Sequence, residues 1–352
     1  MISPILNSLA ARPLWRLAPM AVIALGIMLA AVAWEAANVR AAEYATSQDI
    51  IQAVVGISAM VPEDARTVEH LGTMRSGNGI VIDDQGLVLT IGYLMLEASA
   101  AAVTDADGVL VRASLVAYDH NTGFGLLRAR HPLGIKPVPL GSSADLVEGS
   151  SVIVISKGGS MPVMAARVAS RREFAGYWEY LLEDAIFTVP PNPQYGGAAL
   201  IDSNGRLVGI GSLAVNDAVQ GPKPVRGNMF VPIDALKPIL SELVEKGRTS
   251  GPRHPWLGVY TDETRGRVVV TRTAAGGPAD TAGIRPGDVI MGVGGKRVKS
   301  IADFYRKIWA RGSAGVEIPI DLVPANAESL KIKAIKVHSQ DRYDWLKLNE
   351  GF

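Results

Sequence analysis

Short runs of β-type residues broken by turn residues fill most of the chain between about residues 73 and 231. Residues 79–83, for example, lead through Asp84-Gln85-Gly86 into residues 87–90, which is the pattern of a β-hairpin. Further runs cover residues 109–116, 124–127, 151–155, 178–189, 199–202 and 206–210. Many short strands joined by regular turns predict a β-barrel or a β-sandwich.

The hydrophobic period changes at residues 232–246, where apolar residues recur at helical spacing. Pro232 suits the first turn of a helix and Gly247 suits a C-cap, so we predict one helix between them. Residues 248–252 are polar and rich in turn formers, which places a domain boundary there. The second domain is predicted to start at Trp256 and to contain a helix over residues 301–310.

Composition excludes several classes of function. The 352 residues include 35 Lys and Arg against 34 Asp and Glu, and a net charge of +1 gives no reason to expect a nucleic-acid partner. The chain has no cysteine, which removes disulfides, cysteine nucleophiles and thiolate metal sites. No two of its five histidines lie at a metal-ligand spacing, so the sequence predicts neither a metal nor a cofactor.

An uncharged, mostly apolar run covers residues 17–34, after Arg12 and Arg16 and before Glu35. Eighteen helical residues would span about 27 Å, close to the hydrocarbon core of a bilayer. The positive flank should stay in the cytoplasm, so we expect a single-pass anchor in the bacterial inner membrane with the rest of the chain in the periplasm. Residues 39–41 also fit a cleavage site, which leaves a removed signal peptide and a soluble periplasmic protein as the alternative.

Two motifs in the second domain resemble those of the PDZ domain found in HtrA-type (Do-like) exported serine proteases. Trp256-Leu257-Gly258-Val259 matches the family's carboxylate-binding loop, and residues 282–290 match its most characteristic segment. The resemblance implies that backbone N–H groups of this loop capture the C-terminus of a peptide. It also implies that Ile308, on the following helix, lines the peptide groove. The alternative is a purely structural role, in which these residues only build the core of a small domain.

The preceding region resembles the trypsin-like core of the same family, with residues 228–233 matching its end-of-barrel segment. Together the resemblance covers roughly residues 50–325. It implies a mainly β fold, a double six-stranded β-barrel followed by a PDZ domain behind one membrane helix. The predicted domains are an anchor and linker (1–45), the protease-like domain (46–250), the PDZ domain (251–340) and a C-terminal tail (341–352).

None of the three catalytic positions implied by this resemblance holds a catalytic side chain. Tyr93 stands in place of the histidine, Gly123 in place of the aspartate and Gly196 in place of the serine. A glycine cannot form an acyl-enzyme, and a phenol is a poor proton acceptor at neutral pH. Gln194 replaces a glycine whose N–H normally helps to form the oxyanion hole.

Other residues near these positions admit two interpretations. Asp119, His120, His131, Ser142 and Ser143 could form a displaced triad, but a solvated loop is the favoured interpretation. The aromatic residues nearby could line a peptide-binding cleft or simply pack into the space that the triad vacated. These residues are Tyr93, Tyr177, Trp178, Tyr180 and Tyr195.

The sequence therefore predicts a catalytically inactive serine-protease homologue. We expect it to bind peptide or protein C-termini as a scaffold, adaptor or regulator in envelope protein quality control. One alternative is an active endopeptidase with an unrecognised nucleophile, and another is a holdase-type chaperone. Related proteases form trimers, so the resemblance also implies a homo-oligomer.

Overall fold

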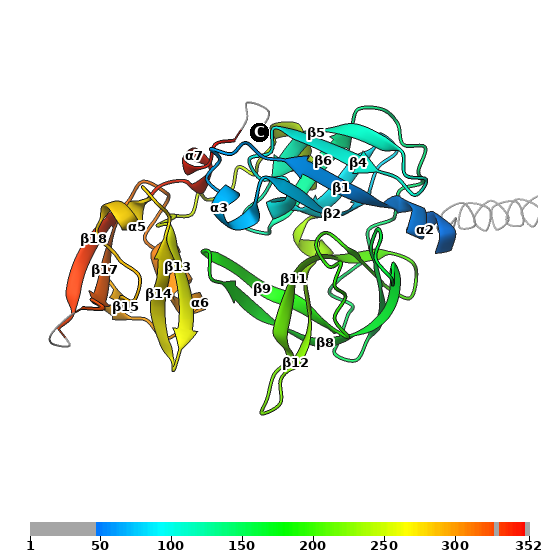
Figure 1. Ribbon diagram of the computed structural model, residues 1–352. Coiled ribbons are helices and arrows are strands. Elements are labelled where there is room, and N and C mark those ends of the chain that lie inside the picture. The colour runs from blue at the N-terminus through cyan, green and yellow to red at the C-terminus, as the bar shows by residue number, and fades with distance from the viewer. Residues whose placement is uncertain (1–46, 327–330, 349–352) are drawn as a thin grey trace, which may run out of the picture. The chain divides into compact units, whose positions relative to one another are not determined.

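The computed structural model describes residues 47–326 and 331–348, and they form a mainly β protein with two closed barrels and one further sheet (Figure 1). Within these residues no helix is both long enough and apolar enough to cross a membrane. The apolar run at residues 17–34 lies outside the described residues.

The first barrel follows the short α2 helix (Ser47–Ala53) and closes in the order β1-β2-β3-β6-β5-β4. Its strands are β1 (Val54–Met60), β2 (Met74–Val81), β3 (Leu87–Ile91), β4 (Ala100–Thr104), β5 (Leu110–Tyr118) and β6 (Phe124–Ala129). The predicted hairpin is confirmed, because β2 and β3 pair with Ile80 opposite Leu89. Between them Gly86 has φ of 77°, a left-handed conformation that glycine adopts without strain.

The second barrel closes in the order β10-β11-β12-β9-β8-β7. Its strands are β7 (Ser151–Ile155), β8 (Val163–Gly176), β9 (Tyr180–Val189), β10 (Ala199–Ile201), β11 (Leu207–Val219) and β12 (Val225–Pro232). The two longest hairpins, β8–β9 and β11–β12, extend beyond the barrel wall (Figure 1). The prediction of one strand over residues 178–189 is wrong at its start, because the chain turns before Tyr180.

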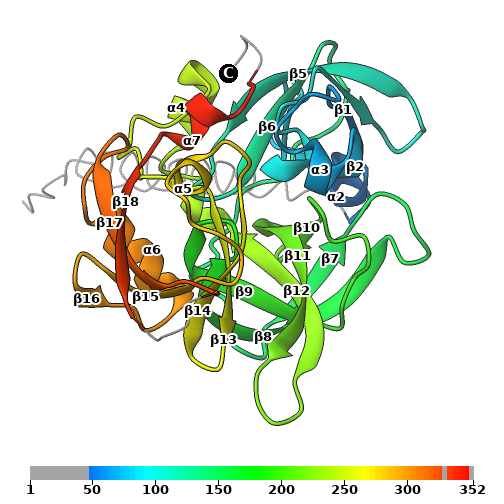
Figure 2. The same ribbon diagram turned by 60° about the vertical axis from the view of Figure 1, so that its left-hand side comes forward.

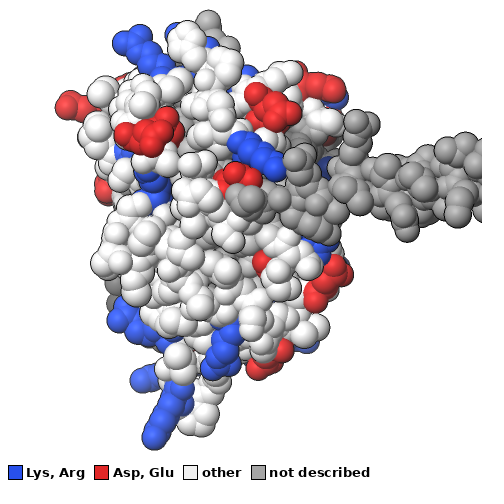
Figure 3. Space-filling view, turned by 90° about the vertical axis from the view of Figure 1, so that its right-hand side faces the viewer, with Lys and Arg blue, Asp and Glu red and all other residues white. Residues whose placement is uncertain are grey.

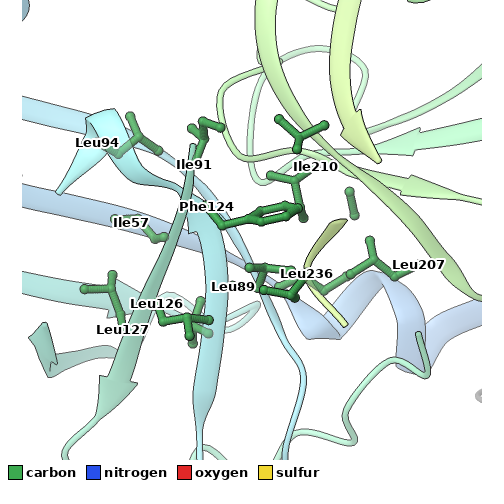
Figure 4. Packing of buried hydrophobic residues seen from close by; sticks show 14 of the residues in the cluster. Ile57, Leu89, Ile91, Leu94, Phe124, Leu126, Leu127, Leu207, Ile210 and Leu236 are labelled. Carbon is green, nitrogen blue, oxygen red and sulfur yellow. The ribbon is translucent and has the colours of Figure 1, made fainter. Parts of the chain in front are cut away.

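The two barrels share one hydrophobic core cluster. Figure 4 shows Phe124 of the first barrel pointing toward Ile210 of the second, with Leu89 close to Leu236. All four side chains are fully buried. Apolar burial therefore holds the barrels together along the seam where a trypsin-like protein places its active site.

The single helix predicted over residues 232–246 is wrong. The chain instead forms a 3₁₀ turn, η3 (Ile233–Ala235), and then the short helix α4 (Leu240–Lys246). Pro238 lies between them, and proline lacks the N–H that a continuous helix needs. The predicted C-cap is confirmed, because Gly247 has φ of 74° and its N–H donates to the Leu243 carbonyl.

The PDZ domain consists of a sheet covered by helix α6 (Ile301–Trp309), which confirms the predicted helix (Figure 2). Ser300 caps this helix by accepting a hydrogen bond from the Asp303 N–H. The other elements are β13 (Val259–Thr264), β14 (Arg267–Thr273), α5 (Pro278–Thr281), β15 (Val289–Val293), β16 (Lys296–Arg297), β17 (Glu317–Val323) and β18 (Lys333–His338).

After β18 the chain returns to the first barrel through helix α7 (Arg342–Trp345). The Tyr343 hydroxyl donates to the Tyr118 carbonyl at 2.5 Å, and the Lys347 N–H donates to the Glu97 carboxylate at 2.8 Å. On the face seen in Figure 3, charges of both signs are interspersed among uncharged residues, in keeping with the nearly neutral net charge.

Candidate functional site

Tyr93, which the resemblance predicts to stand in place of the catalytic histidine, lies in the 3₁₀ turn η2 (Gly92–Leu94) directly after β3. Its hydroxyl reaches across the seam between the barrels and donates to the Ser212 carbonyl of β11 at 3.0 Å. Burial raises the pKa of this phenol well above its ordinary value of 10, so it stays protonated at neutral pH. Tyr93 therefore cross-links the barrels and cannot serve as a general base.

Gly196, which the resemblance predicts to stand in place of the nucleophilic serine, lies directly against Tyr93. A Cβ placed on Gly196 would be 2.8 Å from the Tyr93 hydroxyl oxygen, closer than real Cβ contacts allow. The space that a serine side chain would need is thus occupied by the tyrosine.

Gly123, which the resemblance predicts to stand in place of the catalytic aspartate, has φ of 84°, a conformation that favours glycine over aspartate. Its N–H donates to the Asp119 carbonyl, closing a tight turn before β6. The Tyr180 hydroxyl donates to the neighbouring Thr122 carbonyl at 2.7 Å, which brings a second tyrosine to the site. Burial raises the pKa of Tyr180 as well, so this group also stays protonated.

Gln194 is the residue that the resemblance predicts at one donor position of the oxyanion hole. Its N–H donates to the Asn192 side-chain oxygen at 2.7 Å. The loop is held by Asn78 of β2, whose side-chain amide donates to the carbonyls of Gln194 and Gly196 at 2.7 and 2.8 Å. Asn78 could not be identified from the sequence, because its hydrogen-bond partners lie more than 100 residues away in the chain.

The interpretation of the nearby polar residues as one solvated loop is wrong for two of them. Asp119 and Ser143 are almost fully buried. The Ser143 hydroxyl donates to Asp234, which also accepts from Lys237. His120 instead packs against the ring of Tyr343, with ring centroids 4.8 Å apart. Among the described residues, the hydrogen bonds of the Ser143 cluster include no histidine, so this serine gains no general base.

The aromatic residues that the sequence singled out surround a cavity of about 280 Å³ at the altered catalytic centre. Trp178 and Tyr180 stack with their ring centroids 5.4 Å apart, and Tyr93, Tyr177 and Tyr195 also line the cavity. These aromatic rings therefore both pack against one another and line the cavity. Three arginines, Arg66, Arg272 and Arg342, complete the rim.

The PDZ carboxylate-binding loop holds a carboxylate from the same chain. The N–H of Leu257 donates to the Glu179 carboxylate at 2.9 Å, and the N–H of Val259 donates to it at 2.9 Å. Gly258, between them, has φ of 74° and further stabilises the ionised carboxylate through its backbone. Trp256 is nearly buried and pairs with Gln340 through its backbone.

Glu179 belongs to the turn of the β8–β9 hairpin, whose tip lies next to β13 and α6 (Figures 1 and 2). Its φ is 59°, which is unusual for a residue other than glycine. Two residues earlier, the Tyr177 carbonyl accepts a hydrogen bond from the Thr261 N–H of β13 at 3.0 Å. No local sequence pattern indicated that this turn reaches the PDZ domain.

Helix α6 contributes Tyr305 to this contact, a residue that the sequence analysis missed. The Tyr305 hydroxyl donates to the Gly176 carbonyl at 2.7 Å and accepts from the Glu179 N–H at 3.1 Å. Ile308, the predicted groove residue on the helix, is fully buried in the PDZ core.

Burial raises the pKa of Glu179 to about 7, against the opposing effect of hydrogen bonds from the loop and of the Arg342 charge. The described residues contain no cluster of three or more His, Cys, Asp or Glu side chains able to hold a metal ion. The chemistry available at the described site is thus capture of a carboxylate and of an extended backbone.

Comparisons with known proteins identify both domains. Residues 77–210 match the trypsin-like peptidase domain and residues 255–325 match the PDZ domain. The chain is 30% identical over 290 residues to the chloroplastic protease Do-like 1 of Arabidopsis thaliana, covering 75% of this chain and 64% of that protein. It is 24% identical over 261 residues to the serine endoprotease DegS of Salmonella typhimurium, covering 69% and 72%.

The chain spans 64%, 62% and 52% of the length of the first three curated relatives, so it matches only part of each. Among solved structures, the HtrA-type protease AlgW with a decapeptide has a TM-score of 0.50 at 19% identity, covering 84% of this chain and 99% of that one. This similarity concerns the fold alone. The chain thus contains a trypsin-like peptidase domain and a PDZ domain, and the curated relatives to which it is similar are HtrA-type (Do-like) proteases.

Proposed function

We propose that this protein is a non-hydrolytic member of the HtrA family that binds the C-termini of peptides or proteins through its PDZ domain. The observation that carries the proposal is the loop at Leu257 and Val259, whose N–H groups already hold a carboxylate at hydrogen-bonding distance. A C-terminal peptide presents the same group and an extended backbone that can add to β13.

Three features argue against peptide hydrolysis. Gly196 has no nucleophile, Tyr93 stays protonated and Gly123 has no carboxylate. In proteases of this type the three residues act as a unit, so loss of all three removes nearly all of the rate enhancement. The position of Gln194 removes one oxyanion-hole donor as well, since its N–H is bonded to Asn192.

The proposed setting is the outer face of the bacterial inner membrane, with residues 17–34 as the anchor. There the protein would act as an adaptor or regulator of an active partner in protein quality control, as a homo-oligomer. Support for export comes from the positive flank before the apolar run, and support for the oligomer comes from the family resemblance.

Direct binding of a defined peptide tests this function. The probe is a fluorescein-labelled peptide with the sequence of residues 174–178 followed by valine, prepared with a free C-terminal carboxylate or with an amide. We expect the acid form to bind at least tenfold more tightly than the amide. Gly258→Asp should weaken binding of the acid at least tenfold, because a negative side chain would lie beside the bound carboxylate and Gly258 has left-handed φ.

Gly266→Asp is the matched control, because Gly266 has φ of 70° and nothing lies within 4 Å of its added Cβ. A fluorophosphonate probe should not label the protein, whereas specific labelling would contradict the non-hydrolytic assignment. Equal binding of the acid and amide peptides, in both the wild type and a Glu179→Gly variant, would contradict C-terminal recognition.

A further inference from the structure

We infer that the tip of the β8–β9 hairpin, Gly176 to Glu179, is an internal ligand that closes the PDZ groove, so that a peptide C-terminus binds only by displacing it. This inference rests on the proposed function and adds a regulation of the same site. It makes the hairpin of the protease-like domain a competitor of the external peptide.

The first argument is the carboxylate itself. Glu179 is 8% exposed, and its two oxygens accept hydrogen bonds from Leu257 and Val259, two of the four loop residues expected to hold a peptide terminus. One loop cannot hold two carboxylates on the same N–H groups. Glu179 and an external C-terminus therefore exclude each other.

The second argument is the register of the backbone. Tyr177 lies two residues before Glu179, and Thr261 lies two residues after Val259. The bond from the Thr261 N–H to the Tyr177 carbonyl therefore places the segment antiparallel to β13, the arrangement of an added strand. Both the carboxylate and the main chain of the hairpin imitate a bound peptide.

The third argument comes from the helix that forms the other wall of the groove. The Tyr305 hydroxyl bonds to both Gly176 and Glu179, and Ala175 and Leu181 pack against the PDZ core. Outside the groove, Arg306 forms ion pairs with Glu173 on β8 and Glu183 on β9. The hairpin is thus held along the whole groove, between β13 and α6.

Two features indicate that this closure is reversible. A left-handed backbone is unfavourable for a residue with a Cβ, and Glu179 adopts one with φ of 59°. The flanking ion pairs of Arg306 are exposed to solvent, where such pairs contribute little. A peptide with an unstrained terminal carboxylate and an apolar last residue can therefore compete with the hairpin.

Two substitutions, called the groove variants below, weaken the contact between the hairpin tip and the PDZ groove. Glu179→Gly removes the carboxylate and suits the left-handed backbone, so the turn is retained. Arg306→Glu leaves the carboxylate-binding loop intact and places a negative charge against Glu173 and Glu183. Glu148→Gln, on an exposed glutamate before β7, is the matched control.

The measurement is fluorescence anisotropy of the labelled acid peptide defined above, with the whole chain and each variant. We expect Glu179→Gly to bind at least tenfold more tightly than the wild type, Arg306→Glu at least threefold, and Glu148→Gln equally. Hydrogen exchange at Leu257 and Val259, without peptide, should be faster in both groove variants. Because this readout needs no ligand, it tests closure independently of peptide recognition.

The outcomes distinguish the two proposals. If the wild type binds the acid peptide in preference to the amide and as tightly as both groove variants, the groove is open and only the internal ligand is refuted. If exchange rises in the variants but no protein prefers the acid peptide, closure stands as a contact and C-terminal recognition fails. Unchanged exchange in both variants would overturn the internal ligand by itself.

Discussion

At the scale of single residues, the replacement of the expected histidine by Tyr93 and that of the expected serine by Gly196 depend on each other. The tyrosine hydroxyl lies where a serine side chain at position 196 would have to go, 2.8 Å from the Cβ that a serine would add. The tyrosine also bridges the barrels through Ser212. Restoring a nucleophile alone therefore creates a steric conflict without restoring a base.

Gly196→Ser should accordingly lower the free energy of unfolding by about 1–3 kcal/mol, the usual range for adding atoms to a closely packed site. It should show no peptidase activity and no fluorophosphonate labelling, since Tyr93 cannot accept the serine proton. Thermal denaturation and labelling measure the two effects. Gly251→Ser, at an exposed glycine, is the control for the added hydroxymethyl group. A labelled and equally stable Gly196→Ser protein would contradict the packing described here.

The residues that could be located from the sequence lie in local patterns, whereas those that could not be located act through contacts between distant parts of the chain. Tyr93, Gly123 and Gly196 could be placed because local strand and turn patterns fix their positions in the chain. Asn78 and Glu179 act across long separations, on partners that only the closed barrels and the PDZ domain bring near. A single sequence carries no periodic signal for such contacts.

At the scale of elements, the β8–β9 hairpin shows how tertiary contacts override local preference. The aromatic residues Tyr177 and Trp178 have high strand propensity, which led to the prediction of a strand from residue 178. The chain turns there instead, and the turn gains the hydrogen bonds of Glu179 with the PDZ loop. The same hairpin carries Tyr180 to the altered catalytic centre, so one element joins the two sites.

The pKa of Glu179 gives the docked hairpin a pH dependence. The groups near it are Arg342, Tyr305, His120 and His254; burial lowers the pKa of both histidines, so they are neutral near pH 7. The pKa of Glu179 is about 7 when docked and 4.5 as its ordinary value. A raised pKa means that docking takes up a proton, so docking is strongest at low pH and weakens as the pH rises toward 7.

The acid peptide should therefore bind the wild type roughly tenfold more weakly at pH 5.5 than at pH 8, since the protonated hairpin competes better. In Glu179→Gln this part of the pH dependence is lost, while any contribution of His120 and His254 is retained. Anisotropy titrations of both proteins across this range provide the comparison. An identical pH dependence in the two proteins would mean that Glu179 does not titrate in the groove.

At the scale of the whole molecule, the short β-type runs and their turn residues predicted a β-barrel or a β-sandwich. The family resemblance predicted two barrels followed by a PDZ domain, and both barrels and the PDZ helix are present in that order. The sequence was not sufficient to predict the structure of the segment after residue 340, which was predicted only as a tail. That segment has no long apolar run, and its structure depends on Tyr343 and Lys347 meeting Tyr118 and Glu97 of the first barrel.

This returning segment connects the PDZ domain to the first barrel, whereas the β8–β9 hairpin connects it to the second. Trp345 packs against Trp256 of the carboxylate-binding loop at 4.6 Å between ring centroids, and Lys347 pairs with Asp64 at 2.5 Å. A chain ending at Gln340 loses these contacts and keeps the hairpin, so the hairpin alone must hold the groove closed.

We expect that shortened chain to bind the acid peptide at least threefold more tightly than the wild type and to unfold in two calorimetric transitions instead of one. The reason is that fewer contacts then couple the PDZ domain to the barrels, so each unfolds more independently. A chain ending at Leu348 is the control, because it retains the contacts of Tyr343, Trp345 and Lys347. One transition at an unchanged temperature together with unchanged affinity would show that the hairpin by itself sets the closed state.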